Sequence, residues 1–176
     1  MEYNRAIPVN LSDKVLEVRI MEGAVMQARF TPKLVSKPWG DELWIADGVS
    51  TPYALKKITF LSGKRSSLHV HQMKIETNLV IQGHGYFELS NNKFQTSKFL
   101  DLEQPIEMVK ECLIDISKFE IKAGDTITVE PGYVHRVTAK SDLVFIECSS
   151  CELADVVRLE DDSLRGNGKI ESEHKN

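Results

Sequence analysis

Two histidines and a glutamate, His69, His71 and Glu76, lie close together in the sequence between Gly63 and Gly83, in the arrangement G-x5-H-x-H-x4-E-x6-G. Alternate residues of a strand point to the same face, so His69 and His71 can present two imidazoles to one point, and Glu76 can return to that point from the next strand. Imidazoles with a carboxylate suit zinc, iron(II), manganese, cobalt or nickel, and open positions on such an ion admit water or substrate. The spacing predicts a catalytic metal site.

A second segment, GDTITVEPGYVHR, follows about 50 residues later and carries a lone histidine, His135, behind a Pro131-Gly132 turn. Together the two segments resemble the two motifs of the cupin superfamily. The resemblance implies an all-β double-stranded β-helix, a small jelly-roll barrel. It also implies one divalent transition metal per chain, with zinc as the first candidate and iron, manganese, cobalt or nickel as alternatives. The ligands implied by the resemblance are His69, His71, Glu76 and His135.

Composition narrows the classes of partner. The chain has 176 residues, of which 41% are hydrophobic and 27% charged, with a net charge of −4 and a pI near 5.8. This balance fits one globular barrel and excludes an electrostatic surface for nucleic acid.

The N-terminus lacks a signal-peptide pattern, and no apolar run approaches the roughly 18 residues that span a bilayer, so we expect a cytoplasmic protein. The odd number of cysteines predicts no disulfide framework, and Cys148-Ser-Ser-Cys151 is interpreted as incidental.

The chain divides into three predicted parts: an N-terminal extension over residues 1–33 with a hairpin at 15–30, a barrel over 34–165 and a flexible polar tail over 166–176. Short strands separated by Gly, Asn, Pro or Asp are typical of an all-β fold. An insertion at 93–123 separates the two motifs and includes a possible short helix over Ile106–Leu113. Small barrels expose sheet edges that the hairpin can cover, which predicts a homodimer.

Several flanking stretches resemble the type II mannose-6-phosphate isomerase family. They are Lys37-Pro-Trp-Gly, Tyr53-x-x-Lys-Lys-Ile, Gly63-x-Arg-x-Ser-Leu and VVRLEDD at 156–162. The resemblance implies a metal-dependent sugar-phosphate isomerase acting on a small phosphorylated substrate. This chain departs from that family at His69, where glutamine is usual, at Thr77-Asn78, and in the insertion.

Three residues are the candidates for binding substrate and moving protons. Lys56 shares strand parity with Ile58 and Phe60, and Arg65 shares parity with Ser67, so both can project into the barrel and bind a phosphate. Glu130 stands where the second cupin motif usually has proline, and it is the candidate general base. Glu147 and His84 are alternative bases.

Two other functions compete with isomerisation. A cupin with three histidines, one glutamate and open metal positions can activate oxygen, which predicts a non-haem iron dioxygenase. A non-catalytic cupin would bind a sugar or metal without turnover. Oxygen uptake with iron(II) distinguishes the first alternative, and tight binding without turnover distinguishes the second.

Overall fold

A computed structural model describes residues 6–11, 14–19, 27–29, 31–94 and 115–174. The chain separates into two compact units, residues 1–33 and 34–176. Within the described residues, no helix has the length and apolar character needed to cross a bilayer. The helix predicted over Ile106–Leu113 and Cys112 lie outside the described residues.

The first unit is a three-stranded antiparallel sheet of β1 (Ala6–Leu11), β2 (Lys14–Arg19) and β3 (Gln27–Arg29), in that order. The hairpin predicted over 15–30 corresponds to the pairing of β2 with β3, in which Glu17 lies opposite Arg29. Residues 20–26 and 30 of that hairpin lie outside the described part of the chain. Strand β1 was not predicted, and it extends the sheet by pairing with all six residues of β2.

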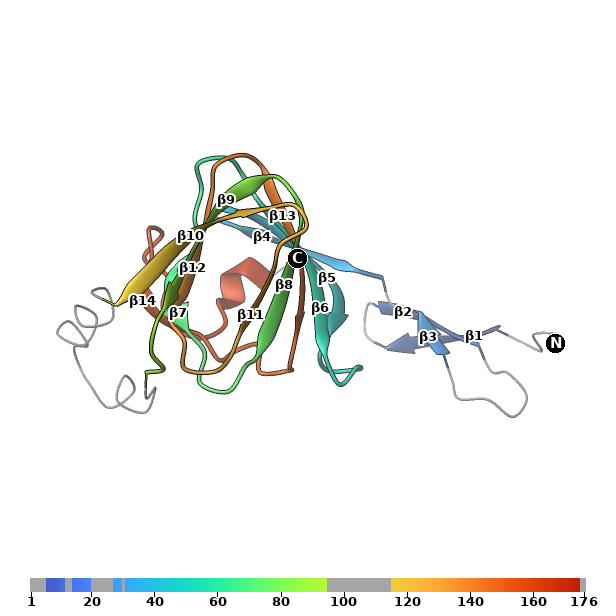
Figure 1. Cartoon of the computed structure of the whole chain (residues 1–176). Coiled ribbons are helices and arrows are strands. Elements are labelled where there is room, and N and C mark those ends of the chain that lie inside the picture. Colours follow the sequence, from blue (N-terminus) through green and yellow to red (C-terminus); the bar gives the residue numbers. More distant parts are fainter. Residues whose placement is uncertain (1–5, 12–13, 20–26, 30, 95–114, 175–176) are drawn as a thin grey trace. The chain divides into compact units, whose positions relative to one another are not determined.

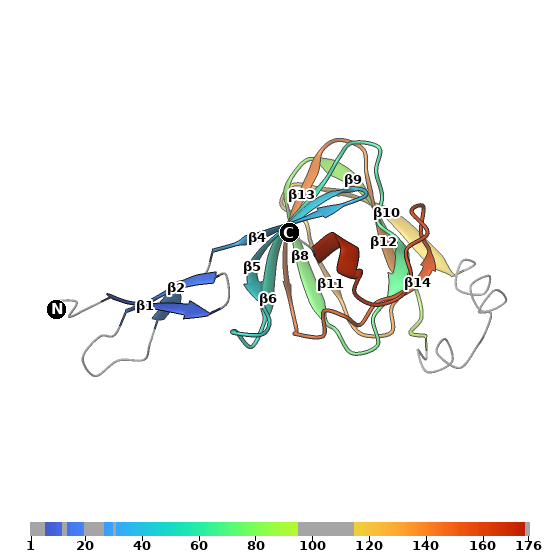
Figure 2. The same ribbon diagram turned by 180° about the vertical axis from the view of Figure 1, so that it is seen from behind.

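The second unit is built from two antiparallel sheets, which Figures 1 and 2 show curving around a common interior. The predicted all-β double-stranded β-helix is confirmed. The five-stranded sheet has the order β10-β9-β12-β7-β14, and the six-stranded sheet has the order β11-β8-β13-β6-β5-β4. The strands are β4 (Lys33–Lys37), β5 (Gly40–Asp47), β6 (Ala54–Phe60), β7 (Leu68–Val70), β8 (Glu76–Gln82), β9 (His84–Ser90), β10 (Ile116–Lys122), β11 (Thr126–Val129), β12 (His135–Ala139), β13 (Leu143–Ser149) and β14 (Val157–Glu160).

Strand alternation explains how the two sheets enclose a core. In β6, every second residue from Ala54 to Phe60 is buried, as expected for a strand with one face inward. Aromatic rings fill one part of the interior: Trp39 stacks on Phe60 with ring centroids 4.2 Å apart, and Phe60 meets Phe145 edge-on at 5.9 Å. Burying such rings drives the sheets together. The other part of the interior is lined by polar and charged side chains, which is unusual for a barrel core.

Glycine is required at the end of the first predicted motif. Gly83 joins β8 to β9 with φ of +81°, a backbone conformation that side chains disfavour. A Cβ atom at this position would lie 2.0 Å from the carbonyl oxygen of Asp142, so no larger residue fits without a backbone shift. The glycine therefore lets the turn approach the loop before β13, which closes this end of the barrel.

The C-terminal residues fold back onto the barrel. They were predicted to be a flexible tail, but residues 166–174 contact the barrel and end in a short 3-10 helix, η1 (Glu171–His174). Lys37 of β4 donates a hydrogen bond to Glu173 at 2.8 Å, and the imidazole of His174 meets the ring of Trp44 edge-on at 5.1 Å. Polar composition alone suggested a loose end, whereas these partners come from strands over 100 residues away in the sequence.

Candidate metal centre

The barrel contains a cavity of about 130 Å³, well above the roughly 10–15 Å³ that one water molecule needs. Residues of both sheets and of the C-terminal segment line it. Its walls include the three motif histidines and several charged side chains, among them Lys37, Glu42, Lys56, Lys74, Glu76 and Glu147.

Three histidines converge on one side of this cavity. His69 lies in β7 and pairs with His135 of the neighbouring strand β12, and His71 follows directly after β7. Leu68 and Val70 point the other way into a separate apolar cluster with Val134, which fixes the parity of the strand. One nitrogen from each of the three imidazoles lies within 4.8 Å of the others.

Backbone carbonyl oxygens orient all three imidazole rings in the same way, with Nδ1 toward the backbone and Nε2 away from it. Nδ1 of His69 faces the carbonyl oxygen of Ser67 at 2.9 Å, Nδ1 of His135 faces that of Tyr133 at 3.1 Å, and Nδ1 of His71 faces that of Asp155. A carbonyl only accepts, so each Nδ1 carries the proton and each Nε2 is left with a lone pair for a metal. Nε2 of His135 is buried and has no hydrogen-bond partner among the described residues.

Glu76 completes the set of donors. Its carboxylate oxygens lie 3.5 Å from Nε2 of His71 and 3.4 Å from Nε2 of His135. Two ligands held about 2.0–2.1 Å from a tetrahedral ion lie roughly 3.4 Å apart, so these separations fit a shared metal. Burial alone would raise the pKa of Glu76, but the Lys74 ammonium beside it holds this pKa well below its usual range. Burial, together with the neighbouring His135 and His71, holds the pKa of His69 well below its usual range. Neutral imidazoles and an ionised carboxylate are the forms that bind a divalent metal.

The loop that carries the ligands is anchored by Asp155. Its carboxylate accepts hydrogen bonds from the backbone N–H groups of Gln72 at 2.9 Å, Met73 at 2.6 Å and Lys74 at 2.9 Å. Its own backbone carbonyl accepts from His71. One residue therefore fixes both a ligand ring and the backbone that leads to Glu76, which lies directly after this loop.

Opposite the histidines, buried lysines and glutamates alternate in a chain of ion pairs. Lys74 donates to Glu76 at 2.5 Å and to Glu147 at 2.9 Å. Lys56 lies 3.5 Å from Glu147 and 3.8 Å from Glu42. Burial alone would lower the pKa of Lys74, but Glu147 and Glu76 raise it above its ordinary value. The candidate ligand Glu76 is therefore linked through Lys74 to a second carboxylate that also lines the cavity.

Glu42 ends this chain of ion pairs. Burial alone would raise its pKa, but Lys56, Lys37 and a 2.7 Å hydrogen bond from Trp44 lower it. Glu42 is 8% exposed, and Lys56 is 7% exposed. Charges this deeply buried are stable only when paired, and such pairs gather at functional sites.

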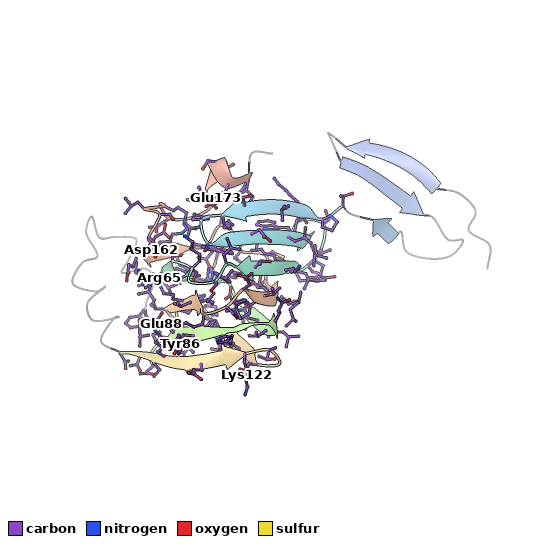
Figure 3. The ribbon with its side chains drawn as sticks, turned by 90° about the horizontal axis from the view of Figure 1, so that it is seen from above. Arg65, Tyr86, Glu88, Lys122, Asp162 and Glu173 are labelled. Atoms are coloured by element: carbon purple, nitrogen blue, oxygen red, sulfur yellow. The ribbon has the colours of Figure 1, made fainter. Side chains whose placement is uncertain are left out.

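The structure separates the predicted substrate-binding residues. Lys56 lines the cavity with Ile58 and Phe60, the set that strand parity predicted. Arg65 lies on the flank of the barrel beside Asp162, as Figure 3 shows, and donates to it at 2.8 Å and to Glu160 at 3.1 Å. Arg65 belongs to a loop that joins β12 through one isolated bridge, so the parity of β7 does not extend to it.

Glu130 also lies away from the cavity lining. Its carboxylate pairs with Lys93 at 2.5 Å, and its side chain is 54% exposed. Glu130 follows Val129, the last and buried residue of β11, so its side chain faces the opposite way. His84, an alternative base, pairs with Ser141 in the turn after β8. Glu147, the other alternative, is the one that lines the cavity.

Lys74 and Glu42 line the cavity but were not predicted to be site residues. Both carried a usable signal, because Lys74 stands two positions before Glu76 and Glu42 two positions before Trp44. Such spacing puts two side chains on one side of an extended chain. Arg136, which follows the candidate ligand His135, forms an ion pair with Glu160 at 3.4 Å.

Comparisons with known proteins agree with the cupin resemblance. The family model for D-lyxose isomerase matches residues 42–163, which contain all four candidate metal ligands. The match is to this sugar isomerase family rather than to the type II mannose-6-phosphate isomerases that the flanking stretches resemble. No curated protein sequence matches the chain.

Solved structures share the fold. The capsular polysaccharide assembling protein CapF from Staphylococcus aureus is 17% identical with a TM-score of 0.54, and the match covers 75% of this chain and 35% of that one. The oxalate decarboxylase of Lactobacillus farciminis in complex with formate is 16% identical with a TM-score of 0.52, over 73% of this chain and 33% of that one. This chain thus matches about a third of each of these longer chains.

Proposed function

Because the chain belongs to the D-lyxose isomerase family, we propose that it is a metal-dependent aldose–ketose isomerase acting on a free, unphosphorylated sugar. The observation that carries the proposal is the position of Lys74, whose ammonium bridges the ligand carboxylate Glu76 and the cavity carboxylate Glu147. With a metal on these ligands, a proton acceptor and a cation would lie beside it.

The residues of the cavity suit the proton movements of this reaction. Converting an aldose to a ketose moves one proton from C2 to C1 and another between the two oxygens. His69, His71, Glu76 and His135 would hold the metal, which would stabilise the negative charge that develops on oxygen. Glu147 takes the proton from C2 and returns it to C1. Lys74 is held as an ammonium by its two carboxylates, so it orients Glu147 and donates a hydrogen bond at the polar end of the substrate.

The balance of charge favours a neutral sugar. A phosphate site was predicted from Lys56 and Arg65 acting together, but Arg65 is paired on the flank of the barrel with Asp162 and Glu160. Lys56 lies between Glu42 and Glu147 within 3.8 Å of each. A phosphate placed beside Lys56 would therefore meet two buried carboxylates, whereas sugar hydroxyls can donate to the carboxylates and accept from the lysine.

Anaerobic turnover tests the proposal. The protein is freed of metal, supplied separately with zinc, manganese or cobalt, and incubated with D-lyxose, D-mannose or D-mannose 6-phosphate while ketose formation is followed by NMR. We expect the free sugars to be converted, and the phosphate ester to be converted at less than about a tenth of their rate.

Three other results would contradict the proposal in different ways. Preferential conversion of mannose 6-phosphate would favour the original prediction of a sugar-phosphate isomerase. Oxygen uptake with iron(II) and no anaerobic turnover would indicate a dioxygenase. Tight sugar binding with no turnover under any metal would indicate a non-catalytic cupin.

A further inference from the structure

The wall of the cavity on its C-terminal side comes from a segment that lies mostly beyond the family match. We call residues 161–174 the C-terminal strap. Strand β14 leads into it, and Figures 1 and 2 show its last turn, η1, lying against the open side of the barrel. The D-lyxose isomerase model ends at residue 163. The strap residues beyond that point that line the cavity are Arg165, Gly168, Lys169, Ile170 and His174.

The strap is held in place by buried ion pairs. Arg165 binds Asp161 through two hydrogen bonds of 2.9 Å, a bidentate pair within the strap. Glu173 then joins the strap to the barrel, because it lies 2.8 Å from Lys37 of β4 and 3.4 Å from Arg165. Figure 3 shows Glu173 beside this edge of the six-stranded sheet. The side chains of Lys37, Arg165 and Glu173 are only 9–11% exposed.

A second set of contacts holds the middle of the strap. The guanidinium of Arg158 in β14 donates to the backbone carbonyls of Gly166 and Gly168, and the backbone N–H of Gly168 donates to Val156 at 2.8 Å. Arg158 also lines the cavity, and its Nε is buried without a partner in the described part of the chain. A buried donor of this kind is costly unless a ligand satisfies it, and a sugar hydroxyl is a suitable acceptor.

Most of the cations at this end of the cavity are paired with carboxylates. Lys37 pairs with Glu42 and Glu173, Arg165 pairs with Asp161 and Glu173, and Lys169 pairs with Glu171. These groups supply many donors and acceptors, which is the chemistry that recognises the hydroxyl groups of a neutral sugar.

From these observations we infer that the C-terminal strap determines substrate specificity, by binding the hydroxyl end of the sugar remote from the metal and limiting the chain length that fits. The inference rests on the proposed function. It divides the cavity into a part that the family match covers, with the candidate metal ligands and the proton-transfer residues, and a part formed mainly by residues beyond the match, which selects among sugars. Glu173 is a positioning residue in this scheme, because it fixes the strap to β4.

The test uses Glu173→Gln and a chain that ends at Ser163, with Asp162→Asn as the control. Asp162 is an exposed carboxylate in the same segment whose partner, Arg65, is on the flank of the barrel. In Glu173→Gln we expect KM for D-lyxose to rise about tenfold, because the strap loses one charged hydrogen bond to the barrel. The values of kcat and of metal content should stay nearly unchanged. We expect the shortened chain to lose the preference between pentoses and hexoses. Asp162→Asn should match the unmodified protein.

Binding of polyols separates this inference from the proposed function. A pentitol and a hexitol carry the hydroxyls of a sugar but no carbonyl, so calorimetry with the metal-loaded protein measures recognition without turnover. Weaker pentitol binding in Glu173→Gln, and equal binding of both polyols by the shortened chain, would support the inference even if no sugar is isomerised. Unchanged polyol affinity and unchanged sugar preference in both variants would overturn it, even if isomerisation is observed.

Discussion

The cavity and the outer flank of the barrel contain the same kinds of charged side chain in opposite surroundings. In the cavity, Lys74, Glu76 and Glu147 are ion-paired with side chains only 5–7% exposed. On the flank, Arg65, Glu160 and Asp162 form a similar cluster with side chains 37–56% exposed. Water screens the exposed cluster, so it contributes little to stability. The buried cluster carries a large desolvation penalty, which is expected where charges serve binding or chemistry.

The largest effect should come from removing a metal ligand. In His135→Ala we expect metal affinity to fall by more than about a hundredfold, because losing only a hydrogen-bond partner of a ligand already costs 10- to 100-fold. Isomerase activity should fall with metal content, measured by elemental analysis after dialysis. Full metal occupancy in this variant would remove His135 from the ligand set.

The next largest effect should come from Glu147. Replacing it with glutamine keeps the shape of the side chain but removes the proton acceptor, so we expect kcat to fall about 10²- to 10⁴-fold with metal content unchanged. Cys148→Ser, the adjacent exposed position on β13, is the control and should keep full activity. Normal turnover in Glu147→Gln would assign the base to another group.

A smaller effect is expected at the anchoring aspartate. Asp155→Asn leaves one side-chain oxygen to accept three backbone N–H groups, so the loop bearing His71 should loosen and metal affinity should fall about 10- to 100-fold. The metal affinity of each variant is measured by competition with a coloured chelator. Asp142→Asn is the matched control, because Asp142 accepts the backbone N–H of Ser62 at 2.9 Å but does not line the cavity. Equal loss of metal affinity in both variants would contradict a specific role for Asp155.

Stability should depend on pH through Glu42. Its pKa in the folded protein is below the ordinary value of 4.5, so the unfolded state takes up the proton first. Its contribution is therefore complete above about pH 4.5 and is lost as pH falls through the folded pKa. We expect Glu42→Gln to lower the free energy of unfolding by about 1–3 kcal/mol at pH 7. The difference between the two proteins in denaturant titrations should shrink below pH 4.5, and a difference that grows instead would contradict the ion-pair assignment.

The smallest effect is expected on the flank. Arg65→Ala removes an exposed cluster, so the free energy of unfolding should change by no more than about 1 kcal/mol and kcat/KM for a free sugar should stay the same. The cavity and the flank would no longer differ in function if this variant lost about tenfold or more in affinity for mannose 6-phosphate. That result would place Arg65 in a phosphate site and favour the sugar-phosphate hypothesis.

The local sequence was sufficient to predict the fold class and the likeness to cupins. Alternation places every second residue of β6 inward, and glycine at position 83 is required by a positive φ and a neighbouring carbonyl. His-x-His spacing likewise depends only on the period of a strand, so the convergence of His69 and His71 was predictable. Short-range geometry determines each of these features, and short-range geometry can be derived from spacing.

Tertiary structure alone decided which charged residues share the cavity. Lys74 meets Glu147 across 73 positions of the sequence, and Lys37 meets Glu173 across 136, so no local pattern relates them. Arg65 was placed inward by counting back along β7, but the chain at Arg65 is a loop and its side chain turns to Asp162. Parity is a property of continuous strands, and where a strand ends depends on its neighbours in the sheet. The sequence by itself thus determined the barrel and its histidines, whereas long-range pairing of β6, β8 and β13 and the return of the C-terminal strap decided the rest of the site.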